Sequence, residues 1–284
     1  MRIPKYWARS SQSVQQPGGR PYQIVIWQWS DASVSDAQRK ADDRVREVAD
    51  KVRAGQQLNR YGYGDRPLRE EITQGVTNAA GSEVAVVTRN AYGALVLNAL
   101  NAMFIDIDFS DKGTAGTSGG GFSFGFGKRA PSQEDQHLER ITAWASRHPD
   151  VGLRVYHTAG GLRCLVTNQT FDPRQSYTLD MLRELESDPL YVRLCKAQEC
   201  FRARLTPKPW RCNVSVPPSR YPWENSDIEI QYRLWERSYE QASRSYGVCR
   251  LVKQIGPQEV HPDVTPILAL HDQVAGVAAQ RPLA

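Results

Sequence analysis

The sequence predicts an α+β protein with open mixed sheets. Short apolar runs bounded by Gly, Asn and Pro alternate with longer segments in which apolar residues recur every three or four positions. Between residues 103 and 204 these elements follow the order strand, helix, strand, strand, helix, strand. That order predicts a split β-α-β module with helices on one face of its sheet and the other face open. We expect an N-terminal α/β part over 1–100, this module over 101–215 and a helical extension over 216–284.

The N-terminal part is expected to combine one long helix with a meander of strands. Residues 34–52 carry an amphipathic stripe of Val and Ala that stops near Gly55. The segment 65–71 predicts the start of a second helix, because a proline stands in its first turn. Runs of β-branched and aromatic residues predict the strands, which are 21–29, 84–89, 94–98 and 103–109.

The central module is expected to contain a compact hairpin, in which 159–161 join the apolar runs 153–158 and 162–167. A last strand is expected near 201–204. Apolar periodicity predicts helices around this hairpin and in the C-terminal part, at 132–148, 177–186, 227–246 and 266–275.

Residues 113–128 are rich in Gly, Ser, Thr and Phe, so they predict a loop that either closes over a ligand or is a disordered insertion. They do not form a phosphate-loop motif, because Phe122 and Arg129 stand where that motif needs Gly and Ser or Thr.

Composition restricts the class of protein. The 284 residues are 40% hydrophobic and 24% charged, and the net charge of +5 permits a phosphate-bearing partner. The first residues lack the apolar core of a signal peptide, and no stretch approaches the roughly 20 apolar residues of a membrane span, so we expect a cytoplasmic protein without a membrane partner. Five cysteines without a C-x-x-C pair suit reduced thiols, and no zinc site is expected from the irregular spacing of Cys195, Cys200 and Cys212.

Two carboxylates interrupt the apolar strand 103–109. Because strand side chains alternate between faces, Asp106 and Asp108 share one face, roughly 6.6 Å apart. Like charges on a partly desolvated face are stable only with a cation, a basic partner or access to solvent. The segment therefore predicts either a divalent-metal site or an edge strand with one solvent-exposed face.

Two basic segments could share the open face of this sheet with the aspartates. The hairpin carries Thr158, Gly161 and Arg163. Residues 193–211 contain six basic residues and a single acid, interleaved with aromatic residues. Such a segment is typical of surfaces that bind phosphates and stack bases, although basic residues on an exposed strand are also commonly a solvated face.

Together these motifs resemble those of the archaeo-eukaryotic primase superfamily. The resemblance covers residues 84–211: a strand with D-x-D, a strand-turn-strand with Thr, Gly and a basic residue, and an Asp followed by Phe-Arg-x-x-x-Thr-x-Lys. From the aspartate strand onward, the order of elements matches a ferredoxin-like or RNA-recognition-like βαββαβ module.

The resemblance implies that Asp106, Asp108 and Asp188 are the catalytic metal ligands for two Mg²⁺ or Mn²⁺ ions in nucleotidyl transfer, with Asp172 as a weaker third ligand. It also implies residues that bind nucleotide or phosphate, which are Thr158, Gly161, Arg163, Arg202, Arg204 and Lys208. Arg163 stands where the family has a histidine; an arginine can hold a phosphate bidentately but cannot replace a histidine-specific role.

The leading hypothesis is a metal-dependent nucleotidyltransferase of primase-polymerase type in DNA replication or repair. It would transfer nucleotides from NTP or dNTP to a nucleic-acid chain, with single-stranded or template nucleic acid, and a helicase, as candidate partners. Arg163 keeps a second hypothesis open, a catalytically inactive primase-like nucleic-acid-binding module. A third hypothesis, a D-x-D nucleotide-sugar transferase, lacks a nucleotide-binding β-α-β signature. The choice between DNA and RNA, and between priming and extension, stays open.

Overall fold

The computed structural model describes residues 1–15, 18–56, 67–109 and 132–284, and it confirms the α+β class. The described strands are β1 Tyr6–Val14, β2 Tyr22–Ser30, β3 Glu71–Thr77, β4 Glu83–Arg89, β5 Leu95–Ala99, β6 Phe104–Asp108, β7 Leu153–Thr158, β8 Gly161–Val166, β9 Phe201–Arg204 and β10 Cys249–Ile255. The described helices are α1 Val34–Arg53, α2 Gln133–Arg147, α3 Ser176–Glu184, α4 Pro189–Gln198, α5 Ser226–Ser243 and α6 Val264–Val274, with a 3₁₀ turn η2 at Pro209–Cys212. The Gly-rich segment at 113–128 lies outside the described residues.

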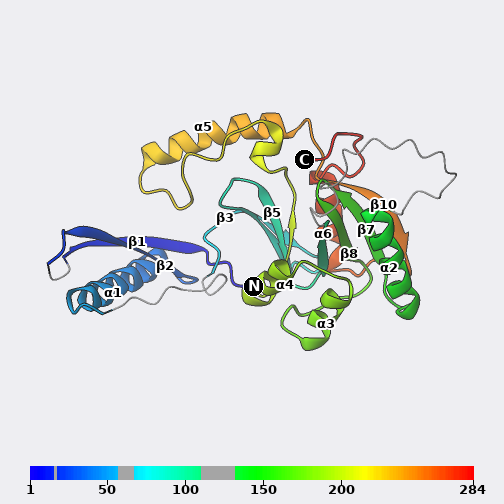
Figure 1. Cartoon of the computed structure of the whole chain (residues 1–284), viewed down its shortest axis with the longest axis horizontal. Helices are drawn as coiled ribbons and strands as arrows, with labels where there is room; N and C mark the ends of the chain where they lie inside the picture. Colours follow the sequence, from blue (N-terminus) through cyan, green and yellow to red (C-terminus); the bar gives the residue numbers. More distant parts are fainter. Residues whose placement is uncertain (16–17, 57–66, 110–131) are drawn as a thin grey trace, which may run out of the picture.

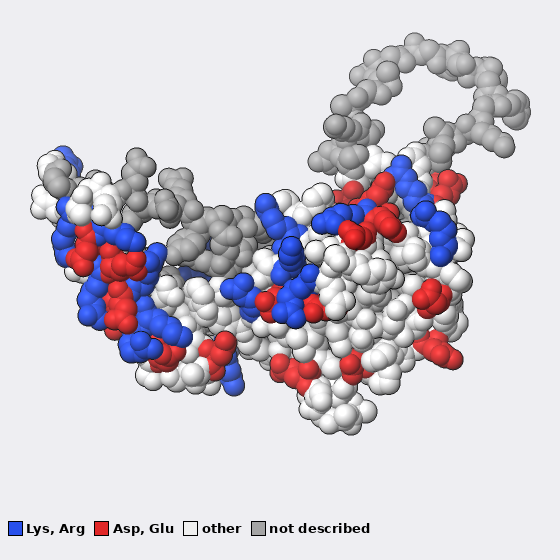
Figure 2. Space-filling view, turned by 90° about the horizontal axis from the view of Figure 1, so that it is seen from below, with Lys and Arg blue, Asp and Glu red and all other residues white. Residues whose placement is uncertain are grey.

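The hairpin β1–β2 and helix α1 form a small unit at one end of the molecule (Figure 1). Ser33 caps α1 by accepting a hydrogen bond from the amide of Asp36, and the buried Val and Ala stripe of the helix packs on the hairpin. The outer face of α1 shows acidic and basic side chains interspersed (Figure 2), which form ion pairs three and four residues apart. Because both signs alternate there, α1 does not offer a uniformly basic surface.

A four-stranded antiparallel sheet of order β3-β4-β5-β9 lies in the middle of the molecule (Figure 1). The helix start predicted at 65–71 is wrong in its described part, because residues 67–70 are not helical and Glu71 opens β3. The β-branched residues of β3 and its pairing with β4 outweigh the local proline signal. This sheet joins strands from both sides of residue 101, because β9 pairs with β5.

The second sheet is also antiparallel and has the order β10-β7-β8-β6. The order β6-β8-β7 is the one expected for three strands of a split β-α-β module. The fourth position differs from the prediction: β9 pairs with β5 in the other sheet, and β10 extends the edge beside β7. Every described strand pair is antiparallel, so the prediction of mixed sheets is wrong.

One hydrophobic core connects the two four-stranded sheets and their helices. It includes Leu97 of β5, Ile105 of β6, Trp144 of α2 and Ile267 of α6, all of which are almost fully buried. Since this core holds β5, β6 and β9 close together, side chains from both sheets can reach one pocket. None of the described helices is both long and apolar enough to cross a membrane.

Candidate functional site

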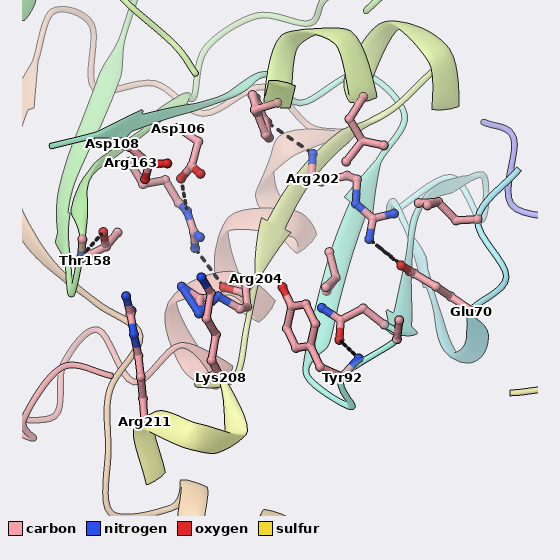
Figure 3. Close-up of a pocket in the computed structure, with 17 residues that line it drawn as sticks. Glu70, Tyr92, Asp106, Asp108, Thr158, Arg163, Arg202, Arg204, Lys208 and Arg211 are labelled. Carbon is pink, nitrogen blue, oxygen red and sulfur yellow. Dashed lines mark hydrogen bonds and ion pairs between the residues drawn. The ribbon is translucent and has the colours of Figure 1, made fainter. Parts of the chain in front are cut away.

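A pocket of about 470 Å³ lies where the two four-stranded sheets meet (Figure 3). Its lining includes residues of β5, β6, β8 and β9 and of the segment that follows β9. Seven of the sequence-predicted site residues line it, namely Asp106, Asp108, Thr158, Arg163, Arg202, Arg204 and Lys208. Residues more than a hundred positions apart in the sequence thus share one cavity.

Asp106 and Asp108 project from one face of β6, as the alternation of strand side chains predicts. The opposite face carries Ile105 and Ile107, which are buried in the core and hold the strand in register with β8. Burial, with the neighbouring charges of Asp106 and Asp188, raises the pKa of the Asp108 carboxyl group. The carboxylates therefore lie close enough to repel each other, which favours a cation beside them.

Arg163 is buried and held by three contacts. Its Nε lies 4.0 Å from Oδ1 of Asp106, its Nη1 donates to the carbonyl oxygen of Arg204 at 2.9 Å, and the same Nη1 lies 3.3 Å from Nε2 of His271. The carbonyl contact joins β8 of one sheet to β9 of the other (Figure 3). Arg163 consequently links the two sheets and places a positive charge beside Asp106.

His271 contacts Arg163 from the core without lining the pocket, and the sequence did not reveal this contact. It is fully buried on α6, and its Nδ1 lies 2.9 Å from Oδ1 of Asp272. Because Arg163 can only donate, Nε2 of His271 must accept, which places the ring proton on Nδ1 toward Asp272. In the sequence His271 stands in a helix without a recognisable motif, so its contact with Arg163 had no local signal.

Burial lowers the pKa of His271 to about 4, so the ring is neutral near pH 7. The unfolded chain binds this proton near pH 6.5, and the folded protein does so only near the lower value. Stability is therefore expected to fall as pH decreases from about 6.5 toward 4. Urea unfolding at several pH values should show a shallower decrease for His271→Gln than for the wild type. Equal slopes for the two proteins would contradict a neutral buried His271.

Arg204, Lys208 and Arg211, here called the basic cluster, line the pocket opposite the aspartates (Figure 3). Burial and the charge of Arg163 lower the pKa of the Arg204 guanidinium, while burial, Arg204 and Arg211 lower the pKa of the Lys208 ammonium. Nη1 of Arg204 is buried and has no hydrogen-bond partner among the described residues. The cluster therefore holds positive charges that repel one another, and an anion in the pocket would relieve that repulsion.

Arg202 lies on the same strand as Arg204 but is already neutralised. Its Nη2 lies 2.9 and 3.0 Å from the two carboxylate oxygens of Glu70, and both side chains are nearly buried. Oε2 of Glu70 also accepts a hydrogen bond from Thr88 at 2.5 Å. Arg202 is thus paired with a carboxylate of the protein itself, and its role in binding phosphate stays a prediction. Sequence reasoning missed Glu70 because it placed the residue in a helix start.

Thr158 and Gly161 shape the end of the β7–β8 hairpin. Oγ1 of Thr158 accepts from the amide of Gly160 at 3.3 Å and donates to the carbonyl of Gly161 at 3.2 Å. A Cβ atom on Gly161 would lie 1.9 Å from the carbonyl oxygen of Ile107. The glycine is required because β6 and β8 approach closely where Asp108 pairs with residue 161.

The backbone of Asp188 contacts the backbone of Asp106, whereas the Asp188 carboxylate caps α4. Its amide donates to the carbonyl oxygen of Asp106 at 2.8 Å, and its Oδ1 accepts from the amide of Tyr191 at 2.7 Å. Within the described part of the chain, no group of three His, Cys, Asp or Glu side chains is arranged to hold a metal ion. Asp172 pairs with Arg174 at 3.0 Å and does not line the pocket.

The donor chemistry at β6 suits a divalent metal, since two carboxylates on one face are ligands that hard cations such as Mg²⁺ and Mn²⁺ prefer. One oxygen of Asp188 is committed to the helix cap, so Asp106 and Asp108 are the principal candidates. No protein-family model, no curated protein and no solved structure matches this chain. The geometry of the pocket consequently carries the functional argument.

Proposed function

We propose that the protein is a metal-dependent nucleotidyltransferase of primase-polymerase type, which transfers nucleotides from nucleoside triphosphates to a nucleic-acid chain. The observation that carries this proposal is the division of charge in one pocket. Asp106 and Asp108 line one side of the pocket with Arg163 next to Asp106, and the basic cluster lines the other side (Figure 3). A triphosphate with a divalent cation has the complementary arrangement of charges.

In this proposal each group has a separate task. A divalent cation bound by Asp106 and Asp108 would supply stabilisation of the negative charge that develops on the phosphoryl oxygens. The basic cluster binds the phosphates, and Arg163 holds a positive charge beside Asp106. The 3′ oxygen of the growing chain attacks the α-phosphorus, and the bond from that phosphorus to the departing pyrophosphate breaks.

The test is incorporation of labelled nucleotides by the purified protein into primed and unprimed single strands, of DNA and of RNA, with Mg²⁺ or Mn²⁺. Extension or initiation is expected with at least one metal, and a chelator should stop it. Absence of incorporation under every one of these combinations would contradict the proposal.

Lys208→Ala is expected to raise KM for the nucleoside triphosphate about tenfold with a smaller effect on kcat, because it removes a charge that contacts the phosphates in both ground and transition states. The matched control is Lys196→Ala on α4, an exposed lysine that does not line this pocket. Steady-state kinetics with varied nucleotide concentration measure both constants. A KM for Lys208→Ala equal to that of the control would place the phosphates elsewhere.

One observation favours a second candidate function, a nucleic-acid-binding module without transfer chemistry. The Asp188 carboxylate caps a helix, and the guanidinium of Arg163 already provides a cation near Asp106. This candidate predicts single-strand binding that weakens steeply with salt and is unaffected by metal or nucleotide. Binding titrations at two salt concentrations, with and without Mn²⁺ and nucleotide, distinguish the two functions.

A further inference from the structure

An aromatic pair stands at the margin of the basic cluster. Tyr92 comes from the turn between β4 and β5 and lines the pocket, and Trp210 comes from η2. Their ring centroids are 5.3 Å apart with the planes at 62°. Trp210 is 50% exposed, which is unusual for so large an apolar side chain.

Both aromatic residues stand on well-supported turns. The side-chain oxygen of Asn90 accepts hydrogen bonds from the amides of Tyr92 and Ala94, at 3.2 and 3.0 Å. Gly93 has a φ of +88°, and a Cβ there would lie 2.1 Å from the Trp235 ring, so this turn is packed tightly against α5. A ring held in this way loses little conformational entropy when a ligand stacks on it.

The segment that carries Trp210 is also held in place by hydrogen bonds. It follows Pro209, and the amide of Arg211 donates to the carbonyl of Lys208 at 2.9 Å to close the turn. The hydroxyl of Tyr239 donates to the carbonyl of Pro207 at 2.6 Å, which anchors the segment to α5. The exposed indole is therefore presented by a fixed segment.

The phosphate-binding charges lie next to this pair. The ammonium of Lys208 is 5.7 Å from the centroid of the Trp210 ring, and Arg211 is the next residue in the same turn. Tyr92 lies near enough to Arg204 to raise the pKa of its guanidinium, against the larger lowering by burial and Arg163. In Figure 3 Arg204 and Lys208 lie between the aspartates and Tyr92. A ligand that spans these groups needs phosphates at one end and a flat aromatic ring at the other.

We infer that Tyr92 and Trp210 form a nucleobase-binding wall: the base of the bound nucleoside triphosphate stacks on one of the two rings, the edge-to-face contact with the other ring holds that ring in place, and the basic cluster binds the phosphates. This inference rests on the proposed function, because it names the part of the same substrate that these rings contact. Stacking uses the π-face that every base has, so the wall binds purine and pyrimidine nucleotides without reading their edges.

The experiment compares ATP with inorganic tripolyphosphate, both with Mg²⁺, by calorimetry on the whole 284-residue chain. The wild type is expected to bind ATP more tightly than tripolyphosphate. Tyr92→Ala and Trp210→Ala should each weaken ATP binding about tenfold and leave tripolyphosphate binding unchanged. Trp210→Phe keeps a ring and should retain most of the ATP affinity. Tyr177→Ala, which removes a 57% exposed tyrosine of α3 that does not line the pocket, is the matched control.

The outcomes separate this inference from the proposed function. If the wild type binds the two ligands equally, or if the aromatic variants bind ATP as the control does, the wall is not a base site and the phosphate site stands. If the wild type binds neither ligand, the proposed function fails and the inference fails with it. Tripolyphosphate binding also serves as a folding check for each variant, because a misfolded protein would lose it.

Discussion

Asp106→Asn and Asp108→Asn are each expected to lower the rate of nucleotide incorporation by about 100-fold or more, because an amide is a far weaker ligand for a hard divalent cation than a carboxylate. Among the described residues, these two are the only carboxylates that line the pocket apart from Glu70, which is paired with Arg202. Loss of either one removes about half of the negative charge available to the cation. Incorporation should fall in kcat, with a smaller change in KM if the phosphates still bind the basic cluster.

The substitution Asp108→Asn should lower activity without lowering the stability of the folded protein. The pKa of Asp108 is raised in the folded protein, so the folded state binds a proton more readily than the unfolded state does, and stability falls as pH rises past the unfolded value. Asp108→Asn removes this repulsion. In buffer without divalent metal at neutral pH, its melting temperature should equal or exceed that of the wild type, as measured by calorimetry. An Asp108→Asn variant that is more stable and less active than the wild type would identify Asp108 as a functional carboxylate.

Asp172→Asn is the matched control, since Asp172 pairs with Arg174 at 3.0 Å and lies outside the pocket lining. It should incorporate nucleotides at the wild-type rate. Incorporation by Asp106→Asn and Asp108→Asn at the rate of this control would contradict metal binding at β6.

Glu70→Ala is expected to destabilise the protein by about 3–5 kcal/mol, because it leaves the buried guanidinium of Arg202 without its counter-ion. The side chains of the pair are 9% and 7% exposed, so water cannot replace the lost contact readily. Nη1 of Arg202 has no hydrogen-bond partner among the described residues, and loss of Glu70 would leave more of its donors unpaired. Chemical denaturation, with the free energy extrapolated to water, measures the loss.

Two further variants test whether the loss of stability in Glu70→Ala comes from the buried charge of Arg202. Asp180→Ala breaks an exposed pair with Arg183 and should cost less than about 1 kcal/mol. The double variant Glu70→Leu with Arg202→Met should recover much of the stability, since well-packed apolar residues can replace a buried ion pair. It should also bind tripolyphosphate like the wild type. A loss of tripolyphosphate affinity in the double variant would assign Arg202 to the phosphate site after all.

Much of the fold around the site followed from local patterns. The helix before the hairpin begins after Ser132, within the segment 132–148 predicted as helical, and the turn at 159–161 joins the two predicted strands. The strands β1 and β10 were missed, because neither has a continuous apolar run: Ser and Gln occupy much of β1, and charged residues interrupt β10. The sequence does not predict helix α4, since the apolar stripe of this helix is short.

The period of two along a strand was sufficient to put Asp106 and Asp108 on one face, because that alternation is a local property of extended backbone. The partners of the basic residues are determined by the tertiary structure instead. Arg202 and Arg204 are two positions apart on the same strand and both line the pocket, yet Glu70 neutralises Arg202, while Nη1 of Arg204 has no hydrogen-bond partner among the described residues. His271 meets Arg163 across 108 positions of sequence. Such pairings depend on how separate sheets and helices pack together, so only the folded chain shows which charges are compensated within the protein and which face a ligand.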